Sequence, residues 1–67
     1  MVDNYALAIK TLRKKMSLSQ EEFARVLGVS FSSINRWENG RHEPTTIIKR
    51  KLKALFREYD VKVDYFF

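Results

Sequence analysis

Cysteine is absent from this chain of 67 residues, and the sequence holds one proline and two glycines. The absence of cysteine excludes a disulfide framework and a thiolate metal site. No stretch approaches the roughly 20 apolar residues that a membrane span needs, and the first residues lack the basic segment and long apolar run of a signal peptide. We therefore expect a cytoplasmic domain that has no contact with a membrane.

Groups for catalysis are also scarce. His42 is the one histidine, and the adjacent residues Glu21 and Glu22 stand at the start of a predicted helix, where acidic side chains complement the helix dipole. A nuclease would need a cluster of carboxylates, which the sequence does not contain. We therefore expect a protein that is not an enzyme and that uses neither a metal nor a cofactor.

Positive charge is in excess, with 13 lysines and arginines against 8 acidic residues and a net charge of +5. An excess of this sign favours a polyanionic partner, because phosphates release counterions when basic side chains bind them. Any single lysine can equally be an ordinary solvated charge, so the clustering carries more weight than the total. The clustered basic residues are Lys10, Arg13, Lys14, Lys15, Lys49, Arg50, Lys51, Lys53 and Arg57.

The central segment, residues 19–40, predicts two short helices joined by a tight turn. Ser19 and Glu22 have the spacing of a capping box, so the first of these helices begins near Gln20. Gly28 can take the left-handed conformation that ends a helix, and Ser30 can cap the next one. Apolar residues at helical spacing give each helix one buried face: Phe23, Ala24, Leu27, Ile34 and Trp37.

Two further amphipathic helices flank this segment. The first follows a cap at Asp3 or Asn4, and the last follows a cap at Thr45. Both show helical spacing of apolar residues, at Tyr5, Ala8, Ile9, Leu12, Ile48, Leu52, Leu55, Phe56 and Tyr59. We therefore predict an all-α helix-turn-helix bundle in residues 1–58.

The last residues, 59–67, have a different pattern. Apolar residues alternate with others at a period of two, and they are β-branched or aromatic, as in a strand. The sequence offers no second strand, so one interpretation is that the tail pairs with the tail of a second copy. The residues of that dimerisation strand would be Val61, Val63, Tyr65 and Phe67. The other interpretation is an irregular tail whose side chains fold back on the bundle.

The central residues resemble the helix-turn-helix domains of phage repressors, Cro proteins and their bacterial relatives, the XRE-type family. The resemblance rests on Gln20, Ala24, Gly28, Ile34 and the run Trp37-Glu38-Asn39-Gly40, and it extends over roughly residues 5–56. It implies a bundle of four to five helices with a recognition helix for double-stranded DNA. It also implies an ion pair between Arg13 and Glu38.

Geometry and chemistry together give two groups of predicted DNA contacts. Residues that point outward from the second central helix would read bases, and Arg36 is the strongest of them, because a guanidinium can bridge O6 and N7 of guanine. The predicted base contacts are Phe31, Ser32, Ser33, Asn35 and Arg36. The predicted phosphate contacts lie at helix starts and after the second helix: Gln20, Ser30, Asn39, Arg41 and His42.

These expectations combine into a sequence-specific regulator of transcription. We predict a homodimeric repressor that binds a palindromic operator in the nucleoid of a bacterium or on phage DNA. The alternative is an interaction protein, an antitoxin or an antagonist of another regulator, whose tail binds a partner protein. The aromatic end VKVDYFF is the feature that keeps this alternative open.

Overall fold

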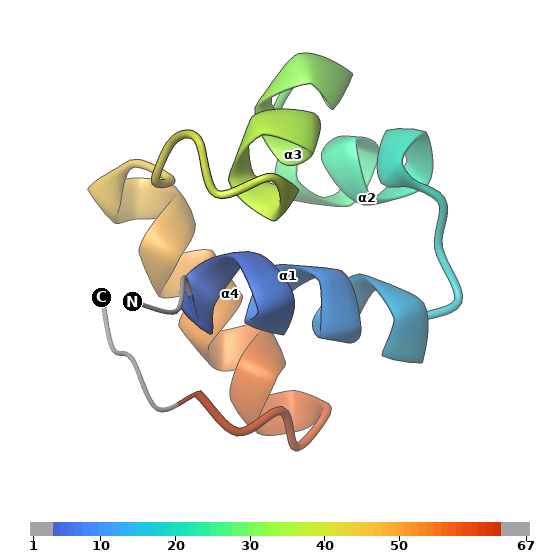
Figure 1. Ribbon diagram of the computed structural model, residues 1–67. Coiled ribbons are helices and arrows are strands. Elements are labelled where there is room, and N and C mark those ends of the chain that lie inside the picture. The colour runs from blue at the N-terminus through green and yellow to red at the C-terminus, as the bar shows by residue number, and fades with distance from the viewer. Residues whose placement is uncertain (1–3, 64–67) are drawn as a thin grey trace.

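Four α-helices make up the fold (Figure 1), which we describe for residues 4–63 of a computed structural model. They are α1 (Asn4–Lys15), α2 (Gln20–Leu27), α3 (Phe31–Glu38) and α4 (Thr46–Glu58), and the described range contains no strand. The predicted all-α class is therefore confirmed. In the same range, no helix is both long and apolar enough to cross a membrane.

Helix α2 begins where the sequence predicts, because its first turn is closed by a complete capping box. The Ser19 hydroxyl accepts a hydrogen bond from the Glu22 amide at 3.1 Å, and the Glu22 carboxylate accepts one from the Ser19 amide at 2.8 Å. Two hydrogen bonds with Ser19 lower the pKa of the Glu22 carboxyl group. The bond from the Ser19 backbone has the larger effect, and the bond with the Ser19 side chain has the smaller one. The start of this short helix is thus defined by local residues.

The turn between α2 and α3 depends on Gly28, which has a φ of 74°. This left-handed conformation ends α2, and the Gly28 amide donates to the carbonyl groups of Ala24 and Arg25. Ser30 then caps α3, since its hydroxyl accepts a hydrogen bond from the Ser33 amide at 3.1 Å. Thr45 stands at the predicted N-cap of α4 but makes no side-chain capping bond.

We expect Gly28→Val to lower the free energy of unfolding by about 1–2 kcal/mol, the cost of a left-handed backbone at an L-residue. A Cβ at this position would meet no atom within 4 Å, so backbone strain rather than a clash of the Cβ accounts for the loss. Gly28→Asn is the matched control, because asparagine tolerates this conformation better. Urea denaturation compares the two variants, and an equal loss for both would contradict this account of the turn.

One hydrophobic core joins the four helices. Helix α1 packs against α3 on one side and α4 on the other, while α2 packs against α3 (Figure 1). The core is built from the predicted apolar faces, and the largest side chains that are fully buried in it are Ile9, Leu12, Phe23, Leu27, Ile34 and Leu52. This packing fixes the position of α3 relative to the rest of the domain.

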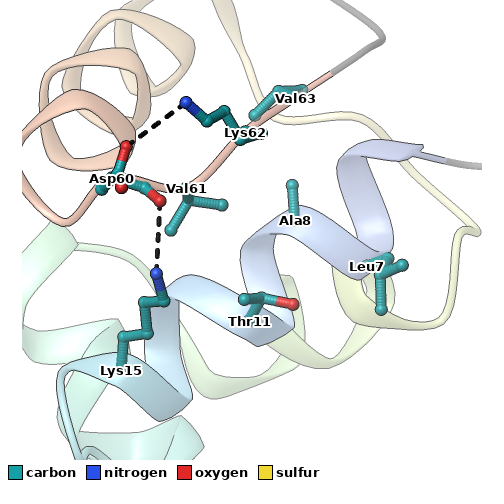
Figure 2. A pocket seen from close by; sticks show the side chains of 8 residues that line it. All are labelled: Leu7, Ala8, Thr11, Lys15, Asp60, Val61, Lys62 and Val63. Carbon is teal, nitrogen blue, oxygen red and sulfur yellow. Dashed lines mark hydrogen bonds and ion pairs between the residues drawn. The ribbon is translucent and has the colours of Figure 1, made fainter.

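Residues 61–63, the last described residues of the tail, lie against α1 without regular secondary structure. Lys15 donates to the carbonyl groups of Tyr59 and Asp60, both at 3.2 Å, and so ties the end of α4 to α1. Val61 and Val63 pack on the core and, with side chains of α1, line a hollow of about 320 Å³ (Figure 2).

The predicted strand is therefore not found in residues 61–63, because the two valines bury apolar surface on the bundle of their own chain. This arrangement follows the second interpretation of the tail. Tyr65 and Phe67, the other residues of the predicted dimerisation strand, lie outside the described residues. The pairing of two tails stays a prediction.

Candidate nucleic-acid interface

An ion pair between Arg13 and Glu38 joins α1 to the end of α3. The Arg13 guanidinium donates from Nε to Glu38 Oε2 at 2.7 Å and from Nη2 to Oε1 at 3.1 Å. This is the pair that the family resemblance implies. The Glu38 side chain is 2% exposed, and its hydrogen bonds raise the pKa of Arg13 further above its ordinary value. Arg13 also donates to the Leu18 carbonyl, which fixes the turn before α2.

The side chain of Gln20, the predicted phosphate contact at the start of α2, forms hydrogen bonds with two residues of α3. Its Nε2 donates to Glu38 Oε1 at 3.1 Å, and its Oε1 accepts from Asn35 Nδ2 at 3.5 Å. Asn35 in turn accepts a hydrogen bond from Asn39 at 3.1 Å. Three predicted contact residues therefore form a connected row rather than independent side chains.

The outward face of α3 carries the other predicted base contacts. Ile34 and Trp37 are buried, as the spacing predicts, so that Phe31, Ser32 and Arg36 are turned to the exposed side. Phe31 is 48% exposed and is one of four large apolar side chains on the described surface. A face of this kind, with one guanidinium, hydroxyls and an exposed ring, has the groups that read base edges and thymine methyls.

The remaining predicted contacts surround this face. Ser33 is half-buried, and its hydroxyl lies 3.0 Å from the Ser30 hydroxyl. The two serines therefore share a side-chain hydrogen bond in addition to the capping bond at the start of α3. Arg41 and His42 are exposed in the loop after α3. His42 Nδ1 lies 3.3 Å from the Glu43 carbonyl oxygen. Residues 4–63 contain no group of three or more side chains that could hold a metal ion.

Sequence reasoning missed the polar row that runs from Glu38 to Asn39. Its members are separated by 15 and 18 residues where it crosses between helices, so no local spacing reveals it. Only the step from Asn35 to Asn39 has a sequence signal, since residues four apart lie on one helix face. The contact of Lys15 with the end of α4 was equally invisible, because it joins residues 44 and 45 apart.

Comparison with known families identifies the family of this domain. The chain matches the helix-turn-helix family over residues 9–66 and therefore belongs to it. This is the DNA-binding, XRE-like family of the repressor and Cro domains that the motif in residues 19–40 resembles, so the predicted recognition is confirmed. No solved structure matches the chain.

The chain is similar to three proteins with different names. An uncharacterized HTH-type transcriptional regulator of Methanothermobacter thermautotrophicus is 38% identical over 52 residues, which cover 76% of this chain and 75% of the relative. The antitoxin PezA of Streptococcus pneumoniae is 50% identical over 38 residues, or 57% of this chain and 24% of that protein. The type II methyltransferase M.SsoII of Shigella sonnei is 44% identical over 48 residues, covering 67% of this chain and 13% of that enzyme.

Proposed function

We propose that this protein is a sequence-specific regulator of transcription that places α3 in the major groove of double-stranded DNA. The observation that carries the proposal is the two-sided character of α3, whose buried face is fixed by the core while its polar face is exposed. Membership in the helix-turn-helix family and the similarity to a named transcriptional regulator support it. The net charge of +5 favours the same partner.

Each part of the interface has a separate task in this proposal. Arg36 reads a guanine through O6 and N7, and the exposed ring of Phe31 contacts a thymine methyl. Ser32, Ser33 and Asn35 complete the contacts to bases. The start of α2, with the Gln20 side chain, holds a phosphate where the helix dipole favours an anion. The phosphate contacts of Ser30, Asn39, Arg41 and His42 set the register of α3 in the groove.

Regulation follows most simply from two copies on one operator. Two recognition helices must be about 34 Å apart to enter successive major grooves on one face of DNA, so a homodimer would bind a palindrome. Occupation of such a site blocks access to a promoter, which makes the protein a repressor that works in the cytoplasm on chromosomal or phage DNA. This proposal requires no enzymatic activity and no cofactor.

We expect Arg36→Ala to cost about 1–3 kcal/mol at the preferred site and to relax the preference at one base position in each half-site. The preferred site comes from selection of bound duplexes out of a random pool with the full chain. Arg57→Ala is the control for loss of one positive charge, because it lies at the carboxyl end of α4, remote from α3 (Figure 1). An equal loss on preferred and random DNA would move Arg36 to the phosphate contacts.

A second candidate function is supported by the similarity to an antitoxin, which covers 38 residues. In that case the tail, which begins beside the hollow lined by Val61 and Val63, would bind a partner protein. A toxin reading frame next to the gene, together with a stable complex of the two purified products, would favour this function. Tight, sequence-dependent binding of DNA by the protein alone would favour the regulator.

A further inference from the structure

Three of the four side-chain amides in this chain form one row across the candidate interface. Asn39 Nδ2 donates to Asn35 Oδ1 at 3.1 Å, Asn35 Nδ2 donates to Gln20 Oε1 at 3.5 Å, and Gln20 Nε2 donates to Glu38 Oε1 at 3.1 Å. Every hydrogen bond points in the same direction, from the exposed Asn39 to the buried Glu38. The longest of them is the one that crosses from α3 to α2.

The direction of the row has a chemical cause at its inner end. An ionised carboxylate accepts hydrogen bonds and donates none, whereas an amide can present either its oxygen or its NH₂ group. Gln20 must therefore turn Nε2 toward Glu38, because the reversed amide would place two acceptor oxygens against each other. This leaves Gln20 Oε1 to face Asn35, which must then offer its own NH₂ group. Asn35 Oδ1 then faces Asn39, so Asn39 must likewise offer its NH₂ group.

We infer that Glu38 is a positioning residue for DNA binding, because its carboxylate fixes which atoms this row of amides presents. Each amide keeps one N–H that the row does not use. Gln20 and Asn35 are half-buried and Asn39 is exposed, so three N–H donors of fixed direction run from the start of α2 to the end of α3. Phosphate oxygens and base acceptors are the groups that they fit.

The consequence is pre-organisation of the interface before DNA arrives. A side-chain amide that can rotate freely must be ordered when it binds, and that ordering opposes association. Arg13 donates two hydrogen bonds to Glu38, one to Oε2 and one to the same Oε1 that accepts from Gln20, so the anchor itself is fixed. The inference rests on the proposed function in its last step, the contact with DNA, while the direction of the amides is a property of the free protein.

The free protein gives the first test, by NMR of the ¹⁵N-labelled full chain. The Gln20 Nε2 protons should show nuclear Overhauser effects to Glu38. Gln20→Met should shift the side-chain amide signals of both Asn35 and Asn39. Asn39→Ala, at the outer end, should leave the effects between Gln20 and Glu38 intact. Absence of those effects in the parent protein, or an unmoved Asn39 signal in Gln20→Met, would overturn the inference.

Binding to a short duplex of random sequence gives the second test. Gln20→Met should lower affinity about tenfold on every sequence, because it removes a hydrogen bond to a charged phosphate. Glu38→Gln should lower affinity by a similar factor, although Glu38 is buried and although loss of a negative charge favours DNA. Glu43→Gln is the matched control: Glu43 is exposed, so removal of its charge should raise affinity slightly.

The double variant Gln20→Met/Glu38→Gln distinguishes a positioning role of Glu38 from a general structural role. If Glu38 acts through Gln20, the double variant should bind no more weakly than Gln20→Met. Additive losses would reduce Glu38 to a structural role and overturn the inference. Where Glu38→Gln does not fold, the NMR comparison of Gln20→Met with Asn39→Ala still decides. Absence of DNA binding by the parent protein would instead refute the proposed function and leave the direction of the amides to the NMR result.

Discussion

Arg13→Met is expected to lower the free energy of unfolding by about 3–5 kcal/mol, because it leaves the buried Glu38 carboxylate without its ionic partner. The Glu38 side chain is 2% exposed and that of Arg13 is 15% exposed, so water cannot replace the lost contacts. A domain of 67 residues has a total stability of about 3–10 kcal/mol. The variant should therefore be partly or wholly unfolded at 25 °C, which urea denaturation followed by circular dichroism measures.

Two controls test whether the burial of the ion pair is the reason for the large loss of stability. Lys49 and Glu43 form an ion pair of similar length, 2.9 Å, but their side chains are 24% and 46% exposed. Lys49→Met should consequently cost no more than about 1 kcal/mol. The double variant Arg13→Met/Glu38→Met should recover much of the loss, because two apolar side chains leave no uncompensated charge. Similar losses for Arg13→Met and Lys49→Met would contradict the role given to burial.

The helices and the turn were predictable because their signals are local. A capping box needs residues three apart, so Ser19 and Glu22 announce the start of α2 in the sequence itself. Gly28 marks the turn because few residues tolerate its φ of 74°. Buried faces follow from a period of 3.6 residues, and the core contains the apolar residues that this period selects.

The left-handed turns at Ser17 and Asp60 were not predictable in the same way. Their φ values are 59° and 55°, yet neither residue type signals this conformation as glycine does. Ser17 ends α1 where Leu18 must reach back to the Arg13 carbonyl, at 3.2 Å. Asp60 follows α4 where Val61 bonds to Phe56 at 2.8 Å. Both bonds span five residues and close the ends of α1 and α4, so these left-handed residues belong to local helix caps of a kind that usually carries glycine.

The candidate site shows the same division. The outward set on α3 was predictable, because residues that are not on the buried face of a helix must lie on the other one. The hydrogen bonds of Gln20 were not, since they depend on the placement of α3 against α1 and α2. A phosphate contact by Gln20 and its attachment to Glu38 are compatible, because an amide nitrogen carries two protons.

The tail was the least predictable part, because its pattern suits two environments. Val61 and Val63 can face a partner strand or the bundle of their own chain, and a period of two alone does not choose between them. In the structure, Val61 and Val63 pack beside the neighbouring surface of α1. Leu7, Ala8 and Thr11 of α1 line the hollow with the two valines (Figure 2), and the valines bury apolar surface against the core of their own chain.

Removal of residues 64–67 is expected to lower affinity for a full palindromic site by about 10²–10⁴-fold, with little change at a half-site. The reason is that two linked copies bind the second half-site as an intramolecular step, and the aromatic end is the part of the chain proposed to link them. Truncation after Val63 keeps the packing of Val61 and Val63 on α1, so the helical domain should stay folded. Sedimentation of the parent and truncated chains measures the assembly, and titration of both duplexes measures the affinity.

A matched set of single replacements tests whether the link is a strand. In a strand, Tyr65 and Phe67 would share the period of Val61 and Val63, whereas Phe66 would fall on the opposite face. Tyr65→Ser and Phe67→Ser should therefore weaken the dimer and the binding of the palindrome, and Phe66→Ser should have the smaller effect. Equal effects of all three would indicate hydrophobic association without strand register. A monomeric parent chain that binds the palindrome as well as its truncated form does would exclude the tail as a dimer element and favour its use as a contact for another protein.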